Sequence, residues 1–447
     1  MSCKRHGTPL WSACGLVVVM MVLAAPVTGC ATFRYGLTSR GQVRSLLQLG
    51  RIEGRIDSLK PAVGPLVVVL TRSVETESRW GLDVDTFVRP GPGRFAFAVT
   101  PGRYELSAYE DRNQSGRVDP GELTWPKHSA PPLDVGPRQG TTQDIVLDSH
   151  ATARRGEMPI EVSHLVAEPP REEVAFSPWA RSAQGTVCPD LRDERFGHET
   201  AVRGLWRPMD FLQEGLAGVY LLAPYDPARV PVLFVHGLVG SPRDLSSLAR
   251  SLDAERFQPW FYFYPSGAPL DDVSAQLARL LAQLEVTHRF KELAIVAHSV
   301  GGLVALDAIF KHAQPMEEDP VRLLITLATP WGGVGRASAA PIWLLPTLED
   351  IAPSSDFLRR LFHSDDGRVR SLPDEVSFHL LIGFRMDVLA TYANDGSVSV
   401  ASQARLEAQN QAGSVRAIDV DHTDILTSPD AIGRMNELLA ERFSRAG

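Results

Sequence analysis

The residues with the clearest chemical potential are Ala297-His298-Ser299-Val300-Gly301, which join an apolar run to an amphipathic one. Leu293 to Val296 read as a short buried strand, and the apolar residues from Val300 to Phe310 suit a packed helix. A sharp turn between them presents Ser299 as a nucleophile, because small residues on either side avoid crowding. The alternative is a buried serine at an ordinary strand-to-helix turn. A hydroxyl is a weak nucleophile, so the chemical interpretation requires a base and an oxyanion site elsewhere.

An upstream segment supplies the oxyanion site. Val230 to Val235 form a continuous apolar strand that ends in His236-Gly237-Leu238-Val239-Gly240. The glycines allow the backbone to approach a developing negative charge, and the amides of Leu238 and Val300 are the predicted donors. His236 could serve as the base, but its place directly after this strand favours a role in shaping the turn.

The acid and the base are predicted downstream. Asp395 lies in a Gly-containing turn after the strand-like Ser377 to Phe384, and His422 follows the strand-like Val415 to Val420. The order Ser299, Asp395, His422 is that of α/β-hydrolases and differs from the orders in other serine hydrolase folds. Asp395 would orient the imidazole, and His422 would move the serine proton.

Other residues compete for these two roles. The rival acids are Asp387, Asp419, Asp421 and Asp424, and the rival bases are His312, His363 and His379. The rival acids are more simply interpreted as solvated loop or strand-end charges. None of the rival histidines has a comparable strand-end loop near the C-terminus.

These motifs resemble those of bacterial lipases and esterases of the α/β-hydrolase superfamily, including those with Ala-x-Ser-x-Gly elbows. The resemblance covers about residues 205–447 and includes Thr329-Pro330-Trp331-Gly332-Gly333 and the stretch 349–358. It implies an α/β fold with a mostly parallel sheet covered by helices on both faces, and cleavage of carboxylic esters through an acyl-enzyme without a catalytic cofactor. Looser similarity reaches inositol-deacylase-like and lecithin-acyltransferase-like branches.

Two alternatives to hydrolysis remain open. The same three residues can transfer an acyl group to an alcohol, and a hydrolase fold can be catalytically idle in a binding lipoprotein of the cell envelope. Lipid or acyl esters are the favoured substrates. Pro341 to Leu345 is either a lipid-facing cap over Ser299 or a segment packed beneath a connecting loop, and Trp331 carries the same ambiguity.

The N-terminus resembles a bacterial lipoprotein signal peptide over residues 1–29. Lys4 and Arg5 precede an apolar stretch from Gly15 to Ala25, and Val27-Thr28-Gly29-Cys30 matches the pattern cut before a lipid-modified cysteine. Acylated Cys30 would anchor the chain to a membrane, followed by a linker to residue 50. Because residue 31 is not acidic, the resemblance implies the outer membrane. A plain secretory signal is the alternative.

Composition agrees with an anchored envelope protein. After removal of the signal and acylation of Cys30, Cys188 alone remains, so no intramolecular disulfide is expected. The net charge of −8 is mild, and no basic block suggests nucleic acid as a partner. The deficit of positive charge also argues against electrostatic capture by anionic lipid, which leaves acylation as the anchor.

Residues 51–150 predict a small all-β sandwich ahead of the catalytic domain at 205–447. The strand-like runs are Leu66 to Leu70, Arg94 to Val99, Tyr104 to Tyr109 and Gln143 to Leu147. This region resembles prealbumin-like or carboxypeptidase-regulatory-like accessory domains. Residues 151–204 mix charge, Pro and scattered apolar residues, and they predict an extended connecting segment that packs partly against the catalytic domain.

The β region also contains a calcium-loop pattern. Oxygen-bearing side chains stand at loop positions 1, 3, 5, 9 and 12, with glycine at position 6; they are Asp111, Asn113, Ser115, Asp119 and Glu122. No helices are expected beside this loop, so the likeness is to calcium loops of secreted β-sandwiches. The ion would be structural. The alternative is a hairpin connection rich in Asn, Asp and Gly that binds no ion.

Overall fold

The computed structural model describes residues 41–72, 82–126, 130–150, 177–312, 319–335, 345–364, 366–385 and 393–444. The predicted signal peptide, Cys30, Asp387 and residues 341–344 of the predicted cap lie outside these ranges. Within them, no helix is both long enough and apolar enough to span a membrane.

Eight strands of the described residues form one central sheet in the order β11-β12-β14-β13-β15-β16-β17-β18. Their bounds are β11 (Ala183–Val187), β12 (Gly218–Leu221), β13 (Val230–Val235), β14 (Phe257–Phe263), β15 (Leu293–His298), β16 (Val321–Leu327), β17 (Ser377–Phe384) and β18 (Ser414–Asp419). From β14 to β18 all neighbours are parallel, whereas β12 pairs antiparallel with β14. This sheet confirms the predicted α/β class and its mostly parallel character.

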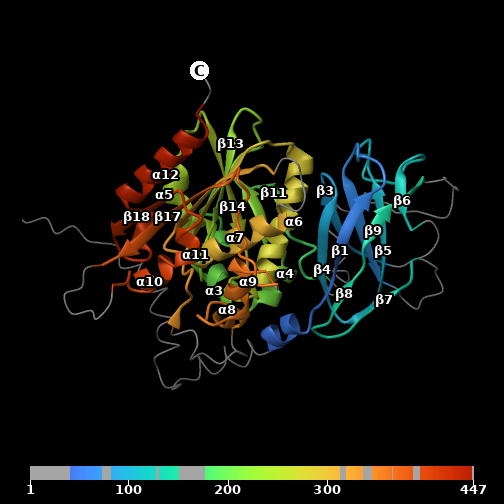
Figure 1. Cartoon of the computed structure of the whole chain (residues 1–447), viewed down its shortest axis with the longest axis horizontal. Coiled ribbons are helices and arrows are strands. Elements are labelled where there is room, and N and C mark those ends of the chain that lie inside the picture. Colours follow the sequence, from blue (N-terminus) through green and yellow to red (C-terminus); the bar gives the residue numbers. More distant parts are fainter. Residues whose placement is uncertain are drawn as a thin grey trace, which may run out of the picture.

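Helices cover both faces of the sheet (Figure 1). The helices are α3 (His198–Trp206), α4 (Pro208–Gln213), α5 (Ser246–Arg250), α6 (Leu270–His288), α7 (Val300–His312), α8 (Pro346–Asp350), α9 (Asp356–Phe362), α10 (Val400–Gln403), α11 (Leu406–Gln409) and α12 (Pro429–Arg442), with 3-10 turns η3 (Glu194–Phe196), η4 (Pro242–Leu245) and η6 (Asp424–Leu426). Successive strand residues point to opposite faces. Leu233 and Val235 therefore join the core under α6 and α7, while Val232 and Phe234 join the core under α5 and α12.

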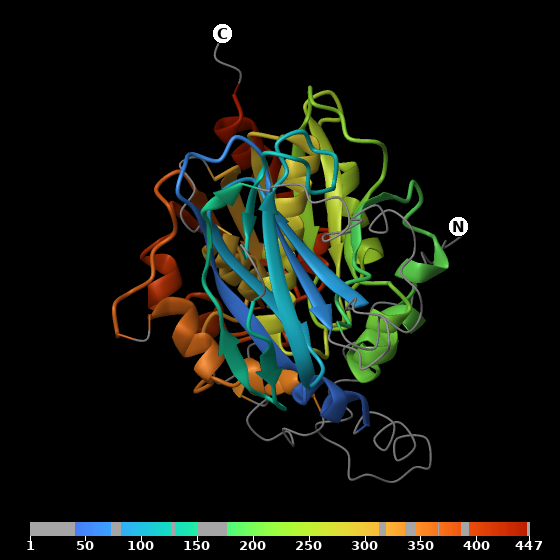
Figure 2. The same ribbon diagram turned by 90° about the vertical axis from the view of Figure 1, so that its right-hand side faces the viewer.

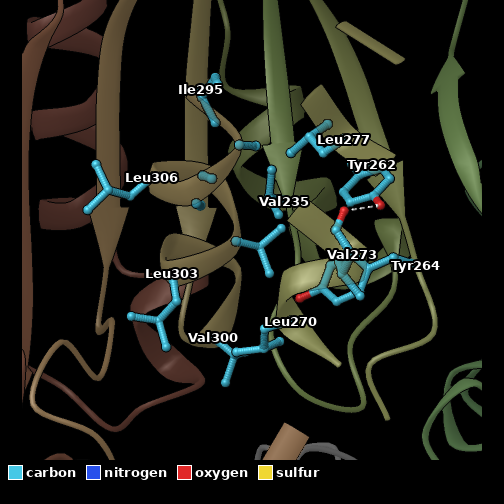
Figure 3. Packing of buried hydrophobic residues seen from close by; sticks show 14 of the residues in the cluster. Val235, Tyr262, Tyr264, Leu270, Val273, Leu277, Ile295, Val300, Leu303 and Leu306 are labelled. Atoms are coloured by element: carbon cyan, nitrogen blue, oxygen red, sulfur yellow. Dashed lines mark hydrogen bonds between the residues drawn. The ribbon is translucent and has the colours of Figure 1, made fainter. Parts of the chain in front are cut away.

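The core under α6 and α7 supports the elbow. Figure 3 shows Val235 and Ile295 from the sheet facing Leu303 and Leu306 of α7, with Leu277 of α6 close by. All of these side chains are fully buried. Close packing of this kind fixes the position of the turn between β15 and α7, because interiors tolerate few voids.

The sheet begins earlier in the chain than the sequence predicts. β11 and most of α3 lie within residues 151–204, which the sequence analysis interprets as an extended connection, and β11 pairs with β12. The connecting-segment prediction is therefore wrong for residues 183–187 and 198–204. The strand signal is weak because β11 reads Ala-Gln-Gly-Thr-Val, which has few apolar residues, and it lies at the sheet edge.

Two further sheets precede the central one. Their strands are β1 (Gly50–Ser58), β2 (Leu66–Arg72), β3 (Leu82–Arg89), β4 (Gly93–Val99), β5 (Gly102–Glu110), β6 (Leu123–Trp125), β7 (Leu133–Val135), β8 (Gly140–Thr142), β9 (Ile145–Leu147) and β10 (Ser149–His150). In the described residues β4, β1, β8 and β9 form one sheet, and β10, β6, β5, β2, β3 and β7 form the other. Ile52 and Phe97 of the first share a core with Val68 and Leu106 of the second. An independent accessory domain stays a prediction.

Two ion pairs, one of them buried, hold the two N-terminal sheets against α6. Asp85 of β3 receives two hydrogen bonds from the Arg279 guanidinium, one of them at 2.8 Å, and both side chains are at most 5% exposed. Arg51 of β1 donates to Asp272 at the start of α6 at 2.6 Å. Figure 2 shows the N-terminal strands in front of the helices of the central sheet. The N-terminal sheets therefore contact α6, which packs against α7, the helix that follows Ser299.

Candidate active site

The turn between β15 and α7 has the geometry of a nucleophile elbow. Ser299 has a φ of +54°, a left-handed conformation that non-glycine residues adopt rarely, and only 6% of it is exposed. Its backbone N–H donates to Leu327 of β16 at 2.8 Å. A Cβ on Gly301 would lie 2.4 Å from the carbonyl oxygen of His236, so this position admits only glycine. The local strain is maintained because the surrounding core fixes both flanking elements.

Ser299, His422 and Asp395 form one chain of hydrogen bonds. His422 Nε2 lies 2.8 Å from Ser299 Oγ, and His422 Nδ1 lies 2.6 Å from Asp395 Oδ2. An ionised carboxylate only accepts, so Nδ1 carries the proton and Nε2 is free to accept from the serine hydroxyl. The structure thus brings together the three residues that the sequence predicts, from loops after β15, β17 and β18.

The acid is held by its own turn. Asp395 Oδ1 accepts from the backbone N–H groups of Ser397 at 2.9 Å and Val398 at 2.7 Å. The carbonyl of Asp395 accepts from the backbone N–H of His422 at 2.8 Å, which ties the acid loop to the base loop. Of the rivals, Asp421 accepts from Arg385 at 2.6 Å and is partly exposed.

The rival histidines lie elsewhere. His379 Nδ1 contacts Ser414 Oγ at 2.7 Å, and His312 at the end of α7 faces Glu285 of α6 at 3.6 Å. His363 forms an isolated bridge with Val369. None of these residues contacts Ser299 in the described part of the chain.

The glycine-rich turn after β13 faces the nucleophile. A Cβ on Gly237 would lie 2.8 Å from Ser299 Cβ, so only glycine allows this approach. Within the described residues, the N–H groups of Leu238 and Val300 donate to no protein acceptor. The N–H of Val239, whose φ is +57°, donates to Ser266 Oγ at 3.1 Å and holds the turn. Two unpaired amides beside a serine hydroxyl suit a developing oxyanion.

His236 shapes this turn. Its Nδ1–H donates to the Gly237 carbonyl at 2.8 Å, and its Nε2 accepts from the Tyr264 N–H at 3.3 Å. The ring stacks on Tyr264 with centroids 4.1 Å apart. Burial lowers the pKa of His236 to about 4, so the ring is neutral at pH 7. With both nitrogens engaged away from Ser299, His236 is not positioned as a base.

Two residues that support the triad are absent from the sequence-based prediction. His298 Nε2–H donates to the His422 carbonyl at 2.9 Å, and Gln403 Nε2 donates to Asp395 Oδ2 at 3.0 Å. Burial, and then the nearby His422, lower the pKa of His298 to about 3, so it acts as a neutral donor. Its position beside Ser299 was the one available signal. Gln403 lies in the short helix α10, and nothing in its sequence context marks it.

Trp331 belongs to the core. It is 1% exposed, and its ring contacts Phe362 at 6.0 Å and Phe378 at 5.6 Å between centroids. The structure therefore favours the packing interpretation over a substrate contact for this residue. In the stretch 349–358, Ser355 caps α9 by accepting from the Leu358 N–H at 3.1 Å.

The predicted calcium loop closes through its own hydrogen bonds. The Asp111 carboxylate accepts from the N–H groups of Ser115 at 2.9 Å and Gly116 at 3.0 Å, and Asp119 accepts from Asn113 and Ser115. Both Glu122 oxygens accept from backbone amides. In the described residues, no group of three or more His, Cys, Asp or Glu side chains is arranged to hold a metal. The side chains as placed do not form a metal cage, and calcium binding stays a prediction.

Residues 229–358 match a protein-family model described as Putative serine esterase (DUF676). This range contains Ser299, Leu238 and Val300 but neither Asp395 nor His422. The chain is a serine hydrolase of carboxylic esters. A comparison with curated proteins finds no match.

The enzyme is also similar to solved lipase and esterase structures. Bacillus licheniformis lipase BlEst2 in mature form is 21% identical with a TM-score of 0.38, and the match covers 48% of this chain and 92% of that one. Aspergillus fumigatus lipase B is 17% identical with a TM-score of 0.40, covering 52% and 57%. The metagenomic carboxyl esterase MGS0156 is 16% identical with a TM-score of 0.36, covering 48% and 76%. Similarity this remote carries no argument about substrate.

Proposed function

We propose that this esterase is a membrane-anchored enzyme that cleaves lipid or acyl esters. Ser299 is the nucleophile, His422 is the base, and Asp395 is the carboxylate that orients His422. The observation that carries the proposal is the continuous hydrogen-bond chain from Asp395 through His422 to Ser299 Oγ. Each member has the proton arrangement that the reaction needs before substrate arrives.

In the acylation step, Ser299 Oγ attacks the ester carbonyl carbon while its proton passes to His422 Nε2. The carbonyl oxygen becomes an oxyanion that the Leu238 and Val300 amides receive. Asp395 stabilises the imidazolium through the hydrogen bond from Nδ1, and the hydrogen bonds that Oδ1 and Oδ2 accept hold the carboxylate in place. The intermediate collapses when His422 protonates the leaving alkoxide, which departs as the alcohol.

In the deacylation step, a water molecule takes the place of the alcohol. His422 removes its proton, the hydroxide attacks the acyl carbonyl, and the same amides receive the second oxyanion. The proton then returns to Ser299 Oγ as the carboxylic acid leaves. If an alcohol enters in place of water, the same sequence transfers the acyl group, which is the alternative reaction.

The membrane part of the proposal depends on the N-terminal sequence. Acylation of Cys30 would place the enzyme on the membrane, and an outer-membrane position follows from the resemblance to lipoprotein signals. A membrane position favours lipid or acyl esters because these substrates concentrate there. Metabolic labelling with an alkyne fatty acid tests the anchor: incorporation in wild type and none in Cys30→Ala is expected, and equal labelling would contradict it.

A fluorophosphonate probe tests the nucleophile. We expect covalent labelling of the folded wild type at Ser299, no labelling of Ser299→Ala, and loss of p-nitrophenyl ester turnover by about 10⁴-fold or more in that variant. Persistent turnover in Ser299→Ala would reject the mechanism, and no turnover in wild type would favour an idle binding lipoprotein. A panel from short esters to emulsified triglyceride and phospholipid, with and without an added alcohol, identifies substrate class and acceptor.

A further inference from the structure

A cavity of about 530 Å³ lies at the amino ends of the parallel strands of the central sheet, whereas the triad lies at their carboxyl ends. Its wall includes the first residues of β13 and β14 and the residues just before β15. The end of α12, at the top of Figure 1, forms another side. Because Ser299, Asp395 and His422 follow the carboxyl ends of parallel strands, the length of the sheet separates them from this cavity. Its wall therefore has no part in ester cleavage.

Positive charge dominates the wall of the cavity. The cationic residues that line it are Arg229, Arg256, Arg289, Lys291 and Arg442. Glu292 is the one acid among the lining residues, and Asp226 pairs with Arg229 at 2.8 Å. Five cations against these two acids leave an excess of three positive charges on a chain whose net charge is −8. Such a local reversal of sign attracts anions.

Neutral acceptors hold the guanidinium groups without cancelling their charge. Arg256 donates to the Phe443 carbonyl at 2.9 Å, and Arg289 donates to the Gln114 side-chain carbonyl at 2.8 Å. Arg442 donates to two backbone carbonyls. A guanidinium carries five N–H donors, so each of these groups keeps donors for a ligand. Arginine recognises phosphate oxygens through such paired donors.

Aromatic rings form another part of the wall. Tyr225 lies over His288 with ring centroids 4.7 Å apart and planes tilted by 33°. Phe257, Phe290 and Phe443 also line the cavity and are buried. The volume lies within the range of about 300–1,000 Å³ that small-molecule sites occupy. An inorganic anion would contact the cations alone. It would leave the rings without a partner and most of the volume empty.

We propose that this cavity binds an organic phosphate, a ligand whose phosphate meets Arg256, Arg289, Lys291 and Arg442 and whose aromatic or apolar part lies against the rings. Two sources supply this chemistry: a phospholipid headgroup and a soluble phosphomonoester. The site is separate from the triad, so it adds a second binding function to the chain.

Calorimetric titration of the full chain carrying Ser299→Ala with phenyl phosphate tests the proposal. We expect saturable binding that weakens with added salt, because the contact is ionic. Lys291→Gln/Arg289→Gln should weaken binding by about tenfold or more, since it removes two charge-assisted donors. Both residues are exposed, so this variant should fold. The matched control is Arg103→Gln/Arg192→Gln, which removes two exposed cations outside the cavity and should bind like the parent.

Competition then identifies the source of the phosphate. Displacement of phenyl phosphate by phosphatidylglycerol vesicles, and not by phosphatidylcholine vesicles, supports a lipid headgroup. Displacement by glycerol phosphate with no effect of either vesicle supports a soluble ligand. Absence of saturable binding, equal binding of phenol, or equal loss in the two double variants would overturn the proposal.

Discussion

Gln403 donates a hydrogen bond of 3.0 Å to Oδ2 of Asp395. That oxygen is the one that also accepts the Nδ1–H of His422 at 2.6 Å. Gln403 is itself fixed, because its side-chain carbonyl accepts from the Gly383 N–H at 2.9 Å and its amide donates to the Gly383 carbonyl. The acid is thereby held between β17 and α10, and its orientation depends on a neutral side chain outside the triad.

Gln403→Leu should lower kcat by about 10- to 100-fold, because a hydrogen bond to a charged group contributes about 1.5–3 kcal/mol. KM should stay close to the wild-type value, because Gln403 contacts Asp395 and the loss falls on the chemical step. The control is Gln409→Leu in α11 (Leu406–Gln409), an exposed glutamine, which should keep wild-type kinetics. Wild-type kcat in Gln403→Leu, or a fall in kcat matched by an equal rise in KM, would contradict this positioning role.

Gly237→Ala should lower kcat by about 10²–10³-fold, the usual effect of losing an oxyanion donor. The new Cβ would stand 2.8 Å from Ser299 Cβ, so either the turn or the elbow must shift. Gly433→Ala in α12 meets open space and should retain full activity with a gain of about 0.5–1 kcal/mol in the free energy of unfolding. For both variants, steady-state kinetics measures kcat and urea denaturation measures the free energy of unfolding. Wild-type turnover by Gly237→Ala would show that the turn does not serve the oxyanion.

Asp85→Leu should lower the free energy of unfolding by about 3–5 kcal/mol, because Arg279 would remain buried and uncompensated. Replacing both partners, as Asp85→Leu/Arg279→Met, should recover most of this loss. The surface pair Arg203–Glu214 provides the comparison, since Glu214→Ala should cost less than about 1 kcal/mol. Denaturant unfolding measures all three variants. Equal effects of Asp85→Leu and Glu214→Ala would mean that the N-terminal sheets do not depend on this contact.

Stability should fall as the solution is acidified below pH 6.5. Burial lowers the pKa of His236 from 6.5 to about 4 and that of His298 from 6.5 to about 3, so the unfolded chain binds protons at these rings before the folded chain does. Each ring then removes up to about 1.4 kcal/mol from the free energy of unfolding per pH unit between 6.5 and its folded pKa, about 4 for His236 and about 3 for His298. Neither ring changes the stability above pH 6.5. Denaturation series at several pH values measure the slope. His298→Gln should reduce it, and an unchanged slope would contradict the assignment.

Calcium should raise the melting temperature of the wild type relative to a chelator if the loop from Asp111 to Glu122 holds an ion. Burial, together with repulsion from Asp111 and Asp119, raises the pKa of Glu122, and a cation would relieve that repulsion. Asp111→Ala should lose the calcium effect, whichever way its own stability changes. An identical melting temperature with calcium and with chelator in wild type would reject the ion.

The local pattern of apolar residues determined much of the catalytic region. The strands over Val230–Val235 and Ser377–Phe384 have the bounds that the sequence predicts, because buried parallel strands are continuous apolar runs between turn residues. The elbow at Ser299 follows from the small residues beside it. The edge strand β11 escaped prediction because its composition is too polar to produce that pattern.

Only the tertiary structure decided which acid, which base and which supporting groups meet. The Gly-containing turn after a strand favoured Asp395 over Asp421, but the distance of 2.6 Å to His422 results from parallel strands ending at one edge of the sheet. The same packing places Gln403 behind the acid and gathers cations at the opposite edge. Long-range contacts of this kind depend on how strands far apart in the chain align, and residue type and local spacing carry no record of that alignment.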